Sequence, residues 1–175
     1  LHNMQTKQVL FLFLLTLSTS IVAKDYTLQS PDKRASVTIT ITDEIRFGIT
    51  MDNKTVINQT HIAFQTDAPT TGLRVKKVSR AAVNQTLYPV IRQKSSAIAD
   101  IYNGMRIDFS NKTSLEWRAY DNGIAWRWLT NINGEYKIID ETVEFSFNES
   151  DIVWYPEEKS FYSGNEPIFT KSSLA

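Results

Sequence analysis

Residues 154–169, WYPEEKSFYSGNEPIF, combine the chemical groups of a possible binding site. Five aromatic side chains stand among three carboxylates: Trp154, Tyr155, Phe161, Tyr162 and Phe169, with Glu157, Glu158 and Glu166. Aromatic rings pack on the apolar faces of pyranoses, and carboxylates accept hydrogen bonds from hydroxyl groups or bind hard cations. Pro156, Gly164 and Pro167 interrupt regular structure. The segment therefore predicts either a sugar-binding loop or a long surface loop held on the core by its aromatic rings.

Other polar residues give weaker signals. His61 lies between Thr60 and Ile62 on an expected strand, where a lone histidine is usually structural. The basic residues between positions 74 and 80 are expected to protect an exposed strand edge: Arg74, Lys76, Lys77 and Arg80. An acidic group is expected in a solvated loop, with a calcium site left open: Asp140, Glu141 and Glu144. Five N-x-Ser/Thr triplets would be glycan sites only in a eukaryotic secretory pathway: Asn53, Asn58, Asn84, Asn111 and Asn148.

The composition excludes several classes of function. The chain has 175 residues, with 19 lysines and arginines against 19 aspartates and glutamates, so its formal charge is zero. No basic excess supports binding to nucleic acid. The absence of cysteine excludes disulfides, thiolate zinc sites and a cysteine nucleophile. A chain of this size is expected to form one domain with a sizeable core.

The N-terminal segment has the pattern of a targeting signal rather than of a structural element. Residues 4–23, MQTKQVLFLFLLTLSTSIVA, combine an early lysine, an apolar run and small residues ending at Ala23, as in a secretory signal peptide. Residues 1–23 are therefore interpreted as a signal peptide. Residues 1–3 precede the first methionine, Met4, and an untranslated origin is left open for them. No later run approaches membrane length, so residues 24–175 are expected to be exported without a membrane anchor.

The rest of the chain has the pattern of strands. In residues 35–42 (ASVTITIT) apolar and polar side chains alternate, and residues 45–51 repeat this alternation after a polar break, which predicts a hairpin. Asp121, Asn122 and Gly123, and later Asn133 and Gly134, suit turns with positive φ. Further strands are expected at residues 55–57, 61–65, 73–83, 88–92, 97–109, 114–120, 123–129, 136–139, 143–147 and 152–155.

Helical periodicity is absent after Ala23, and the pattern predicts an all-β, antiparallel sandwich or barrel. Asn103 and Gly104 mark either a turn or a bulge within one continuous strand. No repeat or internal linker interrupts this series.

Six short segments form an ordered set of motifs. They are residues 28–32 (LQSPD), 85–90 (QTLYPV), 99–103 (ADIYN), 116–127 (EWRAYDNGIAWR), 153–156 (VWYP) and 165–170 (NEPIFT). In this order the chain resembles the N-terminal region of glycoside hydrolase family 97, whose patterns include E-T-W-x-P-V, R-x-x-Y-N and F-R-A-Y-D-D-G-V/I-A-F/W-R. This sequence departs from them at Leu87, Ala99 and Asn122. The fourth segment is interpreted as two inward-facing strands joined by a glycine turn.

The resemblance implies a galactose-mutarotase-like super-sandwich that precedes a (β/α)8 barrel. Family members hydrolyse α-glucosides or α-galactosides, and the barrel carries the catalytic carboxylates, so no catalytic residue is expected in this chain. The N-terminal domain supplies one calcium ligand to the active site, and Glu166 matches it. The chain is thus expected to be a truncated domain, incomplete at its C-terminus. Its expected partners are an oligosaccharide substrate and the barrel of its own polypeptide, and its expected location is the bacterial periplasm.

An alternative is a stand-alone secreted β-sandwich that binds carbohydrate without catalysis, for which residues 154–169 are the motivation. Both interpretations lead to the same expectation about stability. A sandwich that lacks its last strands leaves sheet edges and apolar faces uncovered. Residues 24–175 are therefore expected to aggregate, or to be marginally stable, when they are produced alone.

Overall fold

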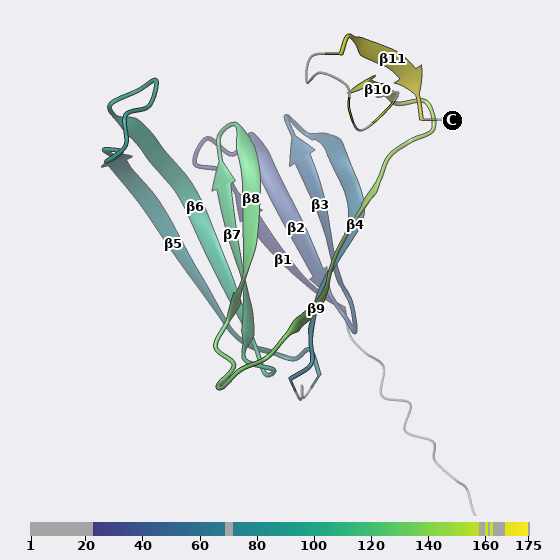
Figure 1. Ribbon diagram of the computed structural model, residues 1–175. Coiled ribbons are helices and arrows are strands. Elements are labelled where there is room, and N and C mark those ends of the chain that lie inside the picture. Colours follow the sequence, from purple (N-terminus) through teal and green to yellow (C-terminus); the bar gives the residue numbers. More distant parts are fainter. Residues whose placement is uncertain (1–22, 69–71, 158–159, 161, 163–166, 175) are drawn as a thin grey trace, which may run out of the picture.

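All of the regular secondary structure in the described part of the chain is β-strand (Figure 1). This computed structural model describes residues 23–68, 72–157, 160, 162 and 167–174. Apart from Ala23, the expected signal peptide lies outside these residues. None of the elements described is a helix long and apolar enough to cross a membrane. The strands are β1 (Lys24–Gln29), β2 (Ala35–Ile41), β3 (Ile45–Met51), β4 (Lys54–Thr66), β5 (Val75–Leu87), β6 (Ile98–Phe109), β7 (Thr113–Tyr120), β8 (Gly123–Thr130), β9 (Ile138–Ser146), β10 (Ile152–Pro156) and β11 (Phe169–Ser173).

Two antiparallel sheets form a sandwich. The first sheet has the order β1-β2-β3-β4-β9 and the second has the order β5-β6-β7-β8. Figure 1 shows the two sheets face to face, with the β10–β11 hairpin set apart from them at one end. The predicted antiparallel β-sandwich is therefore confirmed, and the barrel alternative is wrong because the sheets do not close on each other.

The core lies between the two sheets and follows from the alternation in the sequence. Every second residue of β2 is buried, including Val37 and Ile39, and faces side chains such as Leu115 and Trp117 of β7. The ring of Phe47 on β3 meets Trp117 edge-on, with ring centroids 5.0 Å apart. Apolar burial of this kind is the main favourable contribution to folding, and each fully buried large side chain contributes about 1.5–3 kcal/mol.

Side chains are more exposed to solvent along the two sides of the sandwich than at its centre. No residue of β5, one edge strand of the second sheet, is buried, and the same holds for β9, one edge strand of the first sheet. The closest contacts between the sheets join β1 and β2 to β6, β7 and β8. The two sheets are therefore offset, and each edge strand extends beyond the opposite sheet (Figure 1).

Several strand predictions need correction. Residues 88–92 do not form a strand but belong to the loop between β5 and β6, where no neighbouring strand is available to pair with them. The predicted strands at 55–57 and 61–65 are one strand, β4, with a register irregularity, and those at 136–139 and 143–147 merge into β9. Neither β1 nor β11 was predicted. Asn103 and Gly104 lie inside a continuous β6 without a register shift.

The turns are mostly where the sequence predicts them, but their conformations differ. Asp121 and Asn122 form a two-residue connection between β7 and β8, since Tyr120 pairs with Gly123, yet positive φ was not found there. Positive φ occurs instead at Asp52 and Asn53, at 50° and 62°, in the turn between β3 and β4. Gly134 has the expected positive φ, at 82°.

Candidate functional site

One end of the sandwich gathers the described parts of all six motifs. We call it the loop end; it consists of residues 30–34, the turns at 52–53 and 121–122, the loop at 88–97 and the β10–β11 hairpin (Figure 1, top). The motif at 28–32 follows β1 to this end, and those at 85–90 and 99–103 flank the loop between β5 and β6. Segments distant in sequence are therefore neighbours at one end of the molecule.

A first set of hydrogen bonds joins the motif at 28–32 to the turn at 121–122. The amide N–H of Asp32 donates to Oδ1 of Asp121 over 2.9 Å. Oδ1 of Asp32 accepts from the Ser30 hydroxyl at 2.6 Å and from the Arg34 amide at 2.9 Å. These two hydrogen bonds lower the pKa of Asp32. Arg34 in turn binds Asp52 with two nitrogens, at 2.7 and 2.9 Å, which lowers the pKa of the Asp52 carboxyl.

A second set is centred on Asp100, which is 8% exposed. Its Oδ2 accepts from Nε2 of Gln85 at 2.8 Å, and its Oδ1 accepts from the Tyr120 hydroxyl at 3.1 Å. Nearby, Nδ2 of Asn103 donates to the carbonyl of Gln29 at 2.9 Å. Residues from four of the motifs are thus bonded to one another across β1, β5, β6 and β7.

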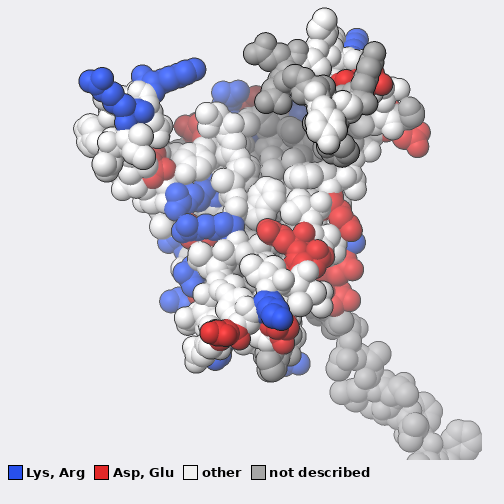
Figure 2. Space-filling view, in the orientation of Figure 1, with Lys and Arg blue, Asp and Glu red and all other residues white. Residues whose placement is uncertain are grey.

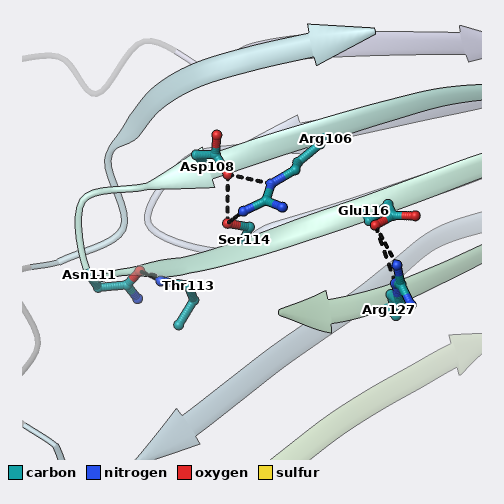
Figure 3. A network of polar contacts seen from close by, with 7 residues as sticks. All are labelled: Arg106, Asp108, Asn111, Thr113, Ser114, Glu116 and Arg127. Atoms are coloured by element: carbon teal, nitrogen blue, oxygen red, sulfur yellow. Dashed lines mark hydrogen bonds and ion pairs between the residues drawn. The ribbon is translucent and has the colours of Figure 1, made fainter. Parts of the chain in front are cut away.

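A third set lies on the outer face of the second sheet. The guanidinium of Arg118 lies over the ring of Tyr102, 4.6 Å from its centroid, and also contacts Glu116 at 3.0 Å. Arg127 of β8 binds the other oxygen of Glu116 at 2.9 Å (Figure 3). Burial raises the pKa of Glu116, but the hydrogen bonds from Arg127 and Arg118 outweigh it and leave this pKa below its usual range. A shallow hollow of about 220 Å³ lies between Glu116, Arg118 and Arg127.

The same face continues toward the opposite end with a smaller network. Nε of Arg106 donates to Asp108 at 2.7 Å, and the Ser114 hydroxyl donates to the same oxygen at 2.7 Å (Figure 3). Asn111, in the turn between β6 and β7, accepts from the amide of Thr113 at 3.1 Å and fixes that turn. Because these charges are paired with one another, the network stabilises the sheet and offers no free acid or base.

The sugar-binding candidate at residues 154–169 is only partly described. Phe161, Glu158 and Glu166 lie outside the described residues. Trp154 and Tyr155 belong to β10, and Phe169 begins β11, where it pairs with Pro156, so the segment is more regular than its prolines suggest. Trp154, Tyr162 and Phe169 are largely exposed, so these rings are not held on the core. Lys171 lies over Trp154, with Nζ 5.8 Å from the ring centroid.

The remaining candidates have structural positions. Nδ1 of His61 contacts Glu144 at 3.1 Å across the β4–β9 pair, which agrees with a structural role. Lys76 and Lys77 lie on β5, the edge strand, as expected for edge protection. Asp140, Glu141 and Glu144 lie on β9 rather than in a loop, so that prediction is wrong. Nowhere in the described part do three or more acidic, histidine or cysteine side chains form a group suited to a metal ion.

Comparison with known proteins gives the family. A profile described as "Glycosyl-hydrolase 97 N-terminal" matches residues 28–175. The chain belongs to this family. A curated relative of this family 97 domain is a retaining alpha-galactosidase of Bacteroides thetaiotaomicron, 29% identical over 183 residues, which cover 97% of this chain and 28% of that protein. The domain thus spans less than a third of that relative.

Solved structures share the fold of this family 97 domain. A glycoside hydrolase family 97 enzyme from Pseudoalteromonas, in complex with acarbose, has a TM-score of 0.70 at 21% identity, over 85% of this chain and 24% of that chain. A single-residue variant of a family 97 enzyme from the same source was solved in complex with panose, at the same similarity. A beta-arabinopyranosidase has a TM-score of 0.68 at 16% identity, over 84% of this chain and 26% of that chain.

The hydrogen-bonded residues of the loop end were not found by sequence reasoning. The motif at 116–127 was interpreted as two inward-facing strands, but only alternate residues of these strands face the core. Trp117 and Ala119 point inward, while Glu116, Arg118 and Tyr120 form the polar networks on the other face. The alternation of polar and apolar residues was the signal for this second face. The meeting of Gln85, Asp100 and Tyr120 had no local signal, because it depends on the pairing of three strands.

Proposed function

We propose that this domain is the N-terminal part of an exported, calcium-dependent glycoside hydrolase. Its substrates are oligosaccharides with α-galactosidic or α-glucosidic bonds. The family profile over residues 28–175 carries the proposal. The bonded motifs at the loop end support it, because the segments that resemble the family lie together there. The retaining alpha-galactosidase at 29% identity favours galactosides.

The domain is proposed to help form the active site of the enzyme without supplying the catalytic residues. Glycoside hydrolysis uses two carboxyl groups, an acid and a base or nucleophile, on opposite sides of the scissile bond. The carboxylates of Asp32, Asp52 and Asp121 are already hydrogen-bonded to neighbours within the domain, and the pKa values of Asp32 and Asp52 are lowered rather than raised as a general acid requires. The catalytic pair is therefore proposed to lie in a (β/α)8 barrel of the same polypeptide.

The calcium part of the proposal rests on Glu166, which lies between β10 and β11 in the sequence and outside the described residues. A calcium ion takes six to eight oxygen ligands, so one glutamate cannot hold it alone. The described residues offer no cluster that would complete such a site. The other ligands are proposed to come from the barrel, and a bound calcium ion would supply positive charge that binds sugar hydroxyls.

The test uses the full-length gene product and two substrates, p-nitrophenyl α-galactoside and p-nitrophenyl α-glucoside. We expect hydrolysis of at least one of them, with loss of activity in EDTA and recovery with calcium. Glu166→Gln should raise the calcium concentration needed for half-maximal activity, while Glu135→Gln, an exposed glutamate at the opposite end, should leave it unchanged. Absence of activity on both substrates in the presence of calcium would refute the enzyme proposal.

A stand-alone carbohydrate-binding domain is the second candidate, and the exposed rings of Trp154, Tyr162 and Phe169 favour it. Exposed aromatic side chains on a secreted protein are suited to stacking on sugar rings. A glycan array with the purified protein separates the two candidates. Binding that is lost in Trp154→Ala, without any hydrolysis by the full-length gene product, would favour this second candidate.

A further inference from the structure

The hairpin of β5 and β6 extends beyond the rest of its sheet. Asn103 is the first residue of β6 that pairs with β7, and residues 98–102 pair only with β5. Residues 83–102, which we call the arm, therefore project from the loop end (Figure 1, upper left). Five residues of extended chain span about 17 Å.

The tip of the arm is apolar and exposed. Val90 is fully exposed, and Ile91 and Tyr88 are 80% and 74% exposed. Leu87, Ile98 and Ile101 add further exposed apolar surface along the two strands. Single exposed apolar residues are common, but a group of six on one projection is a feature of interaction surfaces.

The base of the arm is held firmly. The buried Asp100 joins Gln85 of β5 to Tyr120 of β7 by two hydrogen bonds. These bonds fix the direction in which the arm leaves the sheet, since they connect both of its strands to the neighbouring β7. A fixed projection loses little conformational entropy when it binds a partner, so it is suited to docking.

Charge on the arm indicates what kind of surface it meets. Arg92 and Lys94 lie in the loop at the tip, where Figure 2 shows basic side chains beside uncharged surface. Neither residue takes part in an ion pair with a described residue. Two copies of this tip would repel each other, which disfavours a dimer formed through the arms. An apolar surface with an acidic rim would complement both features.

The length of the relatives indicates where that surface lies. This chain spans 28% of the curated relative and 24% of the acarbose-bound enzyme, so about three quarters of such a protein lies outside the described domain. The last described strand, β11, lies at the loop end, the same end as the arm (Figure 1). A polypeptide of the relatives' length would therefore continue on the side from which the arm projects.

We propose that the arm is a docking element that inserts Tyr88, Val90 and Ile91 into an apolar, acid-rimmed surface on the remaining part of its own full-length polypeptide. The proposal rests on the proposed function, because it assumes that the domain is part of a longer enzyme. The arm thereby sets the orientation of the domain relative to that part.

Hydrogen exchange in the full-length protein tests the docking directly. We expect the amides of residues 90–97 to exchange more than about tenfold more slowly than in an open loop, because the partner surface covers them. The double variant Val90→Ser with Ile91→Ser should lose this protection and lower the unfolding midpoint by several degrees. The variant Arg92→Glu with Lys94→Glu should lower the midpoint at low salt and less at high salt.

The matched control is Val56→Ser with Ile138→Ser. Both residues lie on the first sheet, away from the arm, and are 58% and 62% exposed. This variant should keep the protection of residues 90–97 and the unfolding midpoint. Rapid exchange of residues 90–97 in the unmodified full-length protein would overturn the proposal, as would equal midpoints for the arm variant and the control. Glycosidase activity is a separate readout: protected amides without activity would refute the proposed function and keep the docking, and activity without protection would do the reverse.

Discussion

Asp100 connects three strands through a single buried carboxylate. Replacing it with alanine removes the hydrogen bonds from the half-buried Tyr120 hydroxyl and from the exposed Gln85 amide. At about 0.5–1.5 kcal/mol for each bond, the two together contribute about 1–3 kcal/mol. Asp100→Ala is expected to lower the free energy of unfolding of the full-length protein by that amount in a urea titration, and Asp100→Asn by less. The exposed Glu135→Ala should change it by less than about 0.5 kcal/mol. A loss for Asp100→Ala no larger than that for Glu135→Ala would contradict this role.

Two other carboxylates link stability to pH. The pKa of Asp108 is lowered by hydrogen bonds from Ser114 and Arg106, and the pKa of Glu116 lies below its usual range because its arginine partners outweigh burial. A carboxyl group whose pKa is lower in the folded state stabilises the fold above the unfolded pKa, which is about 4. This stabilisation disappears as the pH falls through the folded pKa.

The free energy of unfolding is therefore expected to be nearly constant above about pH 5 and to decrease below about pH 4. Urea titrations at a series of pH values measure this slope. Glu116→Gln should make the slope shallower, because its side chain no longer titrates, whereas Glu135→Gln should leave the slope unchanged. Identical slopes in the two variants would show that Glu116 does not contribute to the acid sensitivity.

At the scale of elements, the turn between β3 and β4 depends on its residue types. Asp52 and Asn53 both have positive φ, a conformation that asparagine and aspartate tolerate and that β-branched residues disfavour. Asn53→Gly is expected to be neutral or slightly stabilising, and Asn53→Val to destabilise by about 1–2 kcal/mol. Thermal unfolding of the two variants in parallel measures the difference. Equal midpoints would mean that the turn adapts its backbone to valine.

The same elements show how far local sequence pattern determines structure. β2 and β3 were predicted with at most one residue of error, because their alternation reports directly which side chains face the core. β1 does alternate, with Tyr26 and Leu28 buried between exposed residues, but over only six residues, and β11 buries none of its residues. Both are paired strands, β1 with β2 and β11 with β10. Residues 88–92 contain β-forming residues but lack a neighbouring strand. Whether such a segment forms a strand depends on its pairing with distant segments, and a local sequence pattern does not contain that information.

For the whole molecule, the offset of the two sheets leaves one side of the sandwich open. β8 is the second edge strand of the β5-β6-β7-β8 sheet, opposite to β5, and β9 extends the first sheet across from β8. Phe145 of β9 meets Trp126 of β8, with ring centroids 6.5 Å apart, but remains 44% exposed, and Phe147 is 60% exposed. An unpaired strand edge beside exposed aromatic rings is a template for association with another chain.

Residues 24–175 produced alone are therefore expected to self-associate through this open side. Size-exclusion chromatography with light scattering should show oligomers or aggregates, and thermal unfolding should be broad. Phe145→Lys with Phe147→Lys should increase the monomer fraction, because charges beside the β8 edge oppose the addition of a second strand. Val56→Lys with Ile138→Lys adds the same charge on other exposed positions and should have a smaller effect. A sharp two-state transition of an unmodified monomer would show that the open side is stable in water. The offset of the sheets would then be a complete architecture, and β8 and β9 would need no further strands to cover them.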